Sequence, residues 1–258
     1  MGGYILCQVK KAQRPYFIEN ISTNIYSIEE LCFYLYHNLY LIDETIRNEE
    51  LLKWLEDELG LRVLAAKLRS RLRITYPLSE FLYPILKEIN YLSYEEMRTL
   101  NGELERMDQE GFLVQKKKKG DCLVENGMYV NAIQIYREVL REEEPSEGFG
   151  AGVYHNLGCA YSYLFQWEEA LECFGKAFER RDSHTDCRTY LISYRQVHGQ
   201  EAFEKKCEEL GVEEELRLGI QQEFQSTEEK REGSLLQSKE IDGVLERLTL
   251  EYHRSTSA

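Results

Sequence analysis

The sequence predicts an all-α fold in which antiparallel helical hairpins stack as a short solenoid, after an N-terminal helical region with room for a small β-hairpin. Three observations lead to this prediction. Only 4 Pro and 17 Gly occur in 258 residues, too few for a chain of many short strands and turns. Apolar residues recur at intervals of three and four along most of the chain. Small and aromatic residues also recur with a fixed spacing in its second half.

Charge and composition narrow the classes of partner. The chain has 32 Lys and Arg against 46 Asp and Glu, a net charge of −14. Because non-specific binding to nucleic acid and to anionic membranes is largely electrostatic, both partners are disfavoured without a concentrated basic patch. No apolar run reaches the length of about 18 residues that spans a bilayer. The 7 scattered cysteines form no CxxC pair, which predicts buried thiols in a reducing, cytoplasmic setting.

The N-terminal segment begins with strand-forming residues and continues as helices. Residues 4–18 contain two β-branched and aromatic runs around a polar turn, a pattern that favours a small hairpin. Ser27 and Glu30 then form a capping box, which predicts a helix beginning at Ile28. A second leucine-rich helix is expected to end at Gly60.

The next predicted helix, residues 61–73, separates a leucine stripe from a side that carries Arg62, Arg69 and Arg73. This side could dock an acidic ligand, but ion pairing with the nearby acidic residues 56–58 is the favoured interpretation.

Two further signals complete the N-terminal helical region, which we place at residues 1–110. Pro84 is expected to start or kink a helix rather than to lie well inside one. A second capping box, Ser93 with Glu96, opens a polar helix that is expected to run to about Gly111.

The most informative stretch is residues 151–184. Its apolar, small and aromatic residues have the spacing of two packed helices, and the small ones let the helices approach while the aromatic ones fill the remaining space. The residues are Tyr154, Leu157, Gly158, Tyr161, Ala170, Phe174 and Ala177. This pattern resembles the tetratricopeptide repeat. The resemblance implies two antiparallel helices that stack on similar pairs, so we place such repeats at residues 111–212.

Weaker copies flank this stretch. Aligning Ala132 with Ala170 places Tyr136 opposite Phe174 and Gly120 opposite Gly158. The preceding helix, 113–125, departs from the pattern and is either an atypical start of a repeat or a continuation of the helix before it. Residues 185–210 are interpreted as a degenerate repeat. Because about three repeats are needed for stability, we expect the N-terminal helices and the C-terminal segment to pack onto the array.

The resemblance also implies a binding surface, because the first helices of such repeats line a concave groove. The residues assigned to this groove are Val114, Lys117, Asp121, Val124, His155, Asn156, Cys159, Ser162 and Tyr163. Some family members bind a peptide carboxylate with Lys and Asn side chains in this groove. Lys117 and Asn156 fit that arrangement, whereas Asp121 would repel a carboxylate, so we predict a generic peptide groove.

No pattern of catalytic, cofactor-binding or metal-ligating residues stands out, so the sequence predicts neither enzyme activity nor a cofactor nor a metal. The basic run Lys116–Lys119 is interpreted as a solvated helix face rather than a nucleic-acid patch. Residues 213–258 are expected to form capping helices and a frayed tail.

Taken together, these patterns favour a non-catalytic adaptor that binds a peptide or helix of a protein partner. One alternative is an assembly protein that self-associates through its C-terminal helices. A less favoured one is a regulator whose N-terminal helices bind nucleic acid through five basic residues, Arg62, Lys67, Arg69, Arg71 and Arg73.

Overall fold

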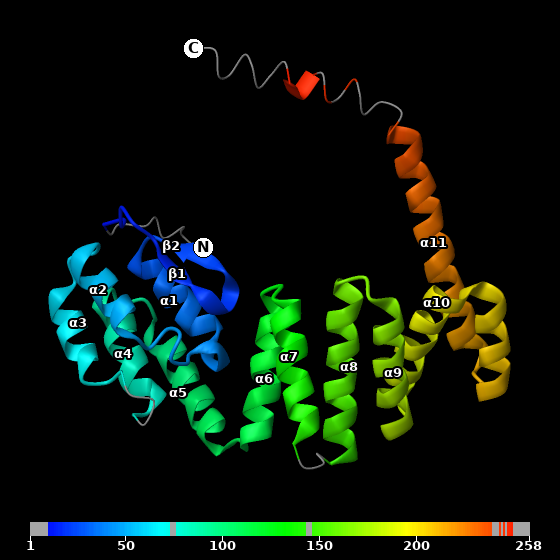
Figure 1. The fold of residues 1–258 in the computed structure, drawn as a ribbon, viewed down its shortest axis with the longest axis horizontal. Helices are drawn as coiled ribbons and strands as arrows, with labels where there is room; N and C mark the ends of the chain where they lie inside the picture. Colours follow the sequence, from blue (N-terminus) through cyan, green and yellow to red (C-terminus); the bar gives the residue numbers. More distant parts are fainter. Residues whose placement is uncertain are drawn as a thin grey trace. The chain divides into compact units, whose positions relative to one another are not determined.

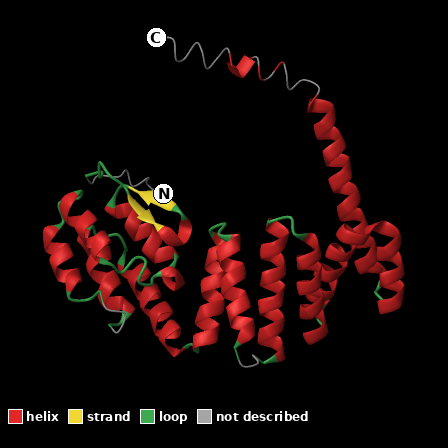
Figure 2. Cartoon of the chain, viewed as in Figure 1, coloured by secondary structure: helices red, strands yellow, loops and turns green. Residues whose placement is uncertain are grey.

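The computed structural model describes residues 10–72, 76–142 and 146–238, together with 243, 245 and 247–249. These residues are mostly helical, as predicted, with one small sheet (Figure 2). The chain divides into two compact units, Met1–Arg181 and Asp182–Ala258. Each unit is described by itself.

The first unit begins with a two-stranded antiparallel sheet. Strands β1 (Tyr16–Ile18) and β2 (Thr23–Ile25) pair with Tyr16 opposite Ile25, and the 3-10 turn η1 (Glu19–Ile21) joins them. A small N-terminal hairpin is therefore present, but it is not the one predicted at 4–18, because the strand at 16–18 pairs with residues 23–25 that follow it. Residues 4–9, the partner expected from the sequence, lie outside the described part of the chain.

Helices follow the sheet at the predicted places. Ser27 and Glu30 form the expected capping box, in which the Ser27 hydroxyl accepts from the Glu30 amide at 3.3 Å. Gly60 ends the second of these helices with a φ of +75°. The elements are α1 (Ile28–His37), η2 (Leu39–Leu41), α2 (Glu49–Asp57) and α3 (Arg62–Arg69).

Pro84 corrects one expectation. It lies buried inside helix α4 (Leu78–Glu88), not at its start. A proline there leaves the Glu80 carbonyl without its usual helical N–H donor. The Arg71 guanidinium supplies a donor instead, with Nη1 3.3 Å from the Glu80 carbonyl oxygen. A side chain from the turn that follows α3 thus satisfies the carbonyl that proline leaves open.

The second half of the first unit is a row of antiparallel helices. Helix α5 (Tyr94–Gln109) starts at the predicted Ser93 capping box and ends where Glu110 adopts an extended backbone. Helix α6 is therefore a new helix and pairs with α7, which settles the question left open by the sequence. The row consists of α6 (Phe112–Glu125), α7 (Tyr129–Arg141), α8 (Glu147–Tyr163) and α9 (Trp167–Arg180), each packed on the next (Figure 1).

The N-terminal helices pack onto this row through α6. Asn126 donates from Nδ2 to Asn38 Oδ1 at 2.7 Å. Lys119 Nζ lies 2.6 Å from Asp43 Oδ2. The expected continuous body is thus observed for the N-terminal helices and the first two helical pairs.

The second unit contains helix α10 (His184–Leu210) and helix α11 (Glu214–Ser238). Gly199, with φ 83° and ψ 179°, breaks α10 into two arms, which agrees with the helical pair expected of a degenerate repeat at 185–210. Leu191, Phe203, Cys207 and Ile220 form the buried core of this unit. The frayed tail expected at 254–258 lies outside the described residues.

Candidate functional site

Two glycine–aromatic contacts fix the geometry of the helical pairs. A Cβ atom on Gly158 would lie 2.7 Å from Phe174 Cε1, so the ring lies directly against the backbone of α8. The earlier pair repeats this contact, because a Cβ atom on Gly120 would lie 2.6 Å from Tyr136 Cε1. Both glycines therefore permit an approach that any larger residue would obstruct.

The other residues assigned to repeat packing lie on α7, α8 and α9. The small residues Ala132, Ala170 and Ala177 are fully buried between helices. Leu157 and Tyr161 are also buried. Tyr154 is half-buried, and the Arg180 guanidinium lies over its ring, 4.6 Å from the centroid.

The predicted groove residues of α6 and α8 meet at one polar network. Asp121 Oδ2 accepts from Lys117 Nζ at 2.7 Å, one helical turn away. Asp121 Oδ1 accepts from Asn156 Nδ2 on α8 and from the Tyr136 hydroxyl on α7, each at 2.7 Å. Burial and the hydrogen bond to Asp121 raise the pKa of Tyr136, so its hydroxyl remains a donor. Three helices thus converge on a single carboxylate.

The remaining groove residues lie on the same two helices. Val114, Val124, His155 and Cys159 are half-buried, and the His155 ring lies 5.6 Å from that of Phe174. Burial raises the pKa of the Cys159 thiol, which favours its neutral form. The other two groove residues lie near the end of α8. Half-buried Ser162 donates to the Gly158 carbonyl at 2.9 Å, and Tyr163 is exposed.

The network involves both side chains that fit the carboxylate-binding arrangement of some tetratricopeptide repeats. Lys117 and Asn156, the two side chains that fit that arrangement, both bind Asp121. Asp121 therefore takes up a hydrogen bond from each of them and adds a negative charge of its own.

Comparison with known families supports the assignment of the pair formed by α8 and α9. A family model described as the tetratricopeptide repeat matches residues 151–184. Neither a curated protein nor a solved structure matches the chain. A tetratricopeptide repeat suggests a role in protein–protein interaction.

The lysine run before the tetratricopeptide repeat is neither a solvated face nor a free basic patch, which corrects the interpretation from the sequence. Each lysine is half-buried and ion-paired to a different carboxylate. Lys116 Nζ lies 2.9 Å from Glu138, and Lys118 pairs with Glu110 while also donating to the Tyr40 hydroxyl at 2.9 Å. With the Lys117 and Lys119 pairs described above, all four charges are neutralised locally.

The arginine-bearing side of α3 shows the favoured ion pairing at one position. Arg69 lies 3.2 Å from Glu49 and 3.0 Å from Glu56. Arg62 and Lys67 are exposed, whereas Arg73 lies outside the described residues. The charges of Arg69 and of the Lys116–Lys119 run are therefore matched locally by carboxylates.

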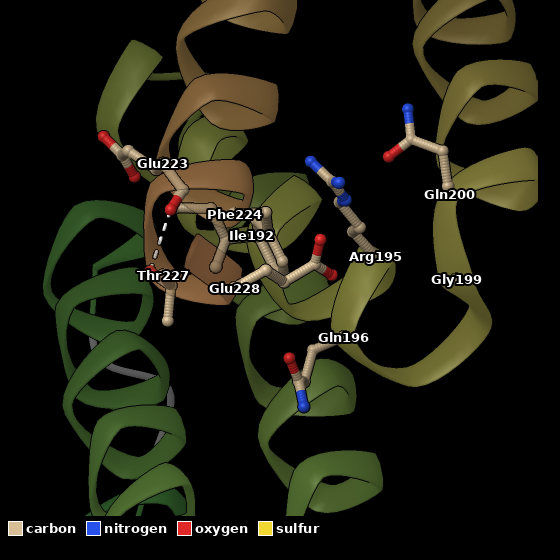
Figure 3. Close-up of a pocket in the computed structure, with 9 residues that line it drawn as sticks. All are labelled: Ile192, Arg195, Gln196, Gly199, Gln200, Glu223, Phe224, Thr227 and Glu228. Atoms are coloured by element: carbon tan, nitrogen blue, oxygen red, sulfur yellow. Dashed lines mark hydrogen bonds between the residues drawn. The ribbon is translucent and has the colours of Figure 1, made fainter. Parts of the chain in front are cut away.

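The second unit holds a cavity of about 610 Å³ between the arms of α10 and helix α11 (Figure 3). The Arg195 guanidinium lies over the Phe224 ring, 4.1 Å from its centroid, and donates to the Ile220 carbonyl at 3.4 Å. Glu223 and Glu228 line the same cavity. Glu223 is also ion-paired to Arg188.

One surface was not predicted from the sequence. Tyr129 at the start of α7 stacks on Tyr163 at the end of α8, with ring centroids 4.6 Å apart and planes at 6°. Phe165, in the turn that follows, has a left-handed backbone with φ 60° and is 77% exposed. Its position one period after Gly127 is the sequence signal that could have identified it.

Two further properties concern only the part of the chain that the structure describes. Within it, no helix is long and apolar enough to cross a membrane. No group of three or more His, Cys, Asp or Glu side chains there is arranged to hold a metal ion.

Proposed function

We propose that this chain is a non-catalytic adaptor whose tetratricopeptide-like pairs bind a peptide or helical segment of a partner protein. The binding surface is the face formed by α6 and α8, which we call the α6/α8 face. It carries the predicted groove residues from Val114 to Tyr163. The observation that carries the proposal is the bond between Asp121 and Asn156, because it joins the first helices of two successive pairs.

The α6/α8 face has the mixed character that peptide recognition requires. Half-buried apolar side chains, such as Val114 and Val124, offer contact area, while Asn156 and Lys117 retain capacity for further hydrogen bonds. The three bonds to Asp121 hold these polar groups in place before a ligand arrives. Preorganisation of this kind lowers the entropic cost of binding.

The chemistry of the face favours internal segments of a partner over a free C-terminus. Asp121 repels a terminal carboxylate, so recognition rests on side chains and backbone amides of the ligand. The free thiols of the described cysteines, Cys32 among them, fit a reducing cytoplasmic setting for this interaction.

The test is affinity capture of the intact protein from its native lysate, followed by capture with the double variant Lys117→Glu, His155→Ala. Reversing the Lys117 charge places two carboxylates side by side and disrupts the network. We expect the partner to be lost while circular dichroism still shows a helical protein.

The matched control is Lys176→Glu. Lys176 also pairs with a carboxylate one helical turn away, that of Glu172, but it lies on α9. This variant should retain the partner. Undiminished capture by the double variant would refute binding at the α6/α8 face.

Exposed leucines support a second candidate, self-association through the C-terminal helices. Leu218 on α11 is 42% exposed, and Leu245 and Leu248 are exposed further along the chain. Light scattering distinguishes the two functions. A dimer that is lost on truncation after Gly211 supports self-association, whereas a monomeric intact chain excludes it.

A further inference from the structure

Two turns of the first unit form one continuous surface, which we call the turn edge and define as residues 125–130 and 163–169. The first turn joins α6 to α7 and the second joins α8 to α9, and both lie at the same end of the row (Figure 1). The stacked rings of Tyr129 and Tyr163 connect the two turns directly. Exposed Val130 extends the apolar area beside them.

The two turns have the same backbone, displaced by 38 residues. Met128 N–H donates to the Leu123 carbonyl at 2.8 Å, and Gln166 N–H donates to the Tyr161 carbonyl at 3.0 Å. The residue between helices is left-handed in both turns, with φ 74° at Gly127 and 60° at Phe165. Glycine adopts this conformation without steric penalty, whereas an aromatic residue does not.

The side chain of Phe165 is little buried, although its backbone is strained. Its side chain is 77% exposed, and its one ring contact in the described structure is an edge-on packing against Trp167, with centroids 5.9 Å apart. Gly127 forms the same turn one period earlier without a side chain. The turn therefore does not require the exposed ring of Phe165. A strained backbone that is retained without a structural benefit indicates a functional role.

Within the two turn segments, the charges are of one sign. The segments 122–131 and 162–170 contain three glutamates, Glu125, Glu168 and Glu169, and no Lys or Arg. All three carboxylates are exposed, and none forms an ion pair with any residue that the structure describes. Aromatic faces beside unpaired carboxylates attract cations, and they favour Arg because its guanidinium can also stack on a ring.

We propose that the turn edge is a second docking surface, for a polypeptide segment in which Arg or Lys side chains alternate with apolar ones. The cations lie against the exposed rings and pair with Glu168 and Glu125, while the apolar side chains contact Phe165 and Val130. This surface shares Tyr163 with the α6/α8 face, but its other residues lie in the two turns. It gives the adaptor a contact for a basic partner.

The test uses the full-length protein and a fluorescein-labelled peptide of alternating arginine and leucine, read by fluorescence anisotropy. A second peptide with glutamate in place of arginine tests the need for the cation. We expect only the arginine peptide to bind, and Phe165→Gly to weaken that binding about tenfold. Since Phe165→Gly leaves the net charge unchanged, non-specific attraction to an acidic protein cannot account for the loss.

Matched variants control for aromatic content and for charge. Tyr94→Ala removes an equally exposed ring at the start of α5, and Glu95→Gln removes a first-turn glutamate of the same helix, as Glu168→Gln does for α9. Both α5 variants should bind like the unmodified protein, whereas Glu168→Gln should bind more weakly.

Several outcomes would overturn the proposal: no binding of the arginine peptide, equal binding by Phe165→Gly, or equal losses in the α5 controls. The double variant Lys117→Glu, His155→Ala should bind the arginine peptide normally. If it does not, the peptide lies on the α6/α8 face instead, and the turn edge is not the site. These measurements therefore test the turn edge as a binding site independently of the proposed adaptor function.

Discussion

Gly158 allows the ring of Phe174 to lie against the backbone of α8, and Gly120 does the same for Tyr136. Protein interiors are packed as closely as organic crystals, so one added methyl group at such a contact forces a rigid buried ring to move. The identity of these two glycines therefore sets the distance between the helices of each pair. Ala170 and Ala132 contribute in the same way from the facing helices.

Substituting Gly158→Ala should destabilise the protein by about 1–3 kcal/mol, because the new Cβ atom overlaps the Phe174 ring. Urea unfolding followed by circular dichroism measures the change. Gly102→Ala is the matched control, since α5 has open space around that glycine, and we expect it to stabilise the helix by about 0.5–1 kcal/mol. Equal effects at both positions would contradict the packing argument.

Substitutions at the two left-handed turn residues should change the stability of the protein in opposite directions. Gly127→Ala forces a Cβ atom into a left-handed backbone and should cost about 1 kcal/mol. Phe165→Gly relieves the same strain, so its melting temperature should equal or exceed that of the unmodified protein. A clear loss of stability in Phe165→Gly would show that the ring is kept for folding and not for a partner.

Helix α6 connects the N-terminal helices to the repeat pairs through charged and polar contacts. Lys119 and Lys118 reach Asp43, Tyr40 and Glu110, while Asn126 reaches Asn38. The lysine run is thus an element of structure, in which each charge is matched by a carboxylate: Asp121 of the same helix pairs with Lys117, and residues outside α6 pair with the other three.

Low pH should weaken the contacts between α6 and the N-terminal helices. Burial opposes ionisation of Asp43, but hydrogen bonds from Lys119 and Thr45 outweigh it and hold the pKa of Asp43 below its usual 3.8. A depressed carboxyl pKa contributes stability above the unfolded-state value, and that contribution is lost as pH falls through the folded-state value. Stability should therefore fall as pH decreases from about 5 to below 3.8.

The variant Asp43→Asn isolates this contribution. It should cost about 1–2 kcal/mol at neutral pH and flatten the acid limb of the stability curve. Thermal melts at a series of pH values measure both effects. The prediction is wrong if the variant and the unmodified protein lose stability in parallel as the pH is lowered.

The sequence predicts those elements whose defining contacts join residues that are close together in the chain. The capping boxes at Ser27 and Ser93 lie within four residues, so the helix starts could be predicted from the sequence. The place of Pro84 could not, because the Arg71 side chain that satisfies the Glu80 carbonyl comes from the turn that follows α3. The pairing of Lys119 with Asp43 is likewise a contact between distant segments.

In the candidate site too, the local features can be predicted from the sequence and the contacts between distant residues cannot. The fixed spacing of the repeat is sufficient to predict that Asn156 and Lys117 lie on the first helices of neighbouring pairs, but it does not indicate that Asp121 binds both. The turn edge was not predicted, because the spacing that places Phe165 one period after Gly127 does not indicate whether its ring is exposed. The left-handed φ of Phe165 is a property of the folded backbone that the residue type does not suggest.

At the scale of the whole molecule, the first unit should fold without the second. The N-terminal helices and the two helical pairs form one compact unit that ends at Arg181. A chain truncated after Arg181 should therefore unfold in a single cooperative transition. A chain truncated after Glu110 loses the α6 contacts and should melt at a lower temperature. Equal melting temperatures for the two fragments would contradict the role of α6.

The most direct test of the adaptor function is amide hydrogen exchange of the intact protein, alone and with a partner captured from its lysate. Binding on the α6/α8 face should slow exchange in residues 112–125 and 147–163, because the ligand covers these two helices. Slowed exchange confined to residues 182–238, with the first unit unchanged, would show that the partner binds elsewhere and that the repeat pairs are not the recognition surface.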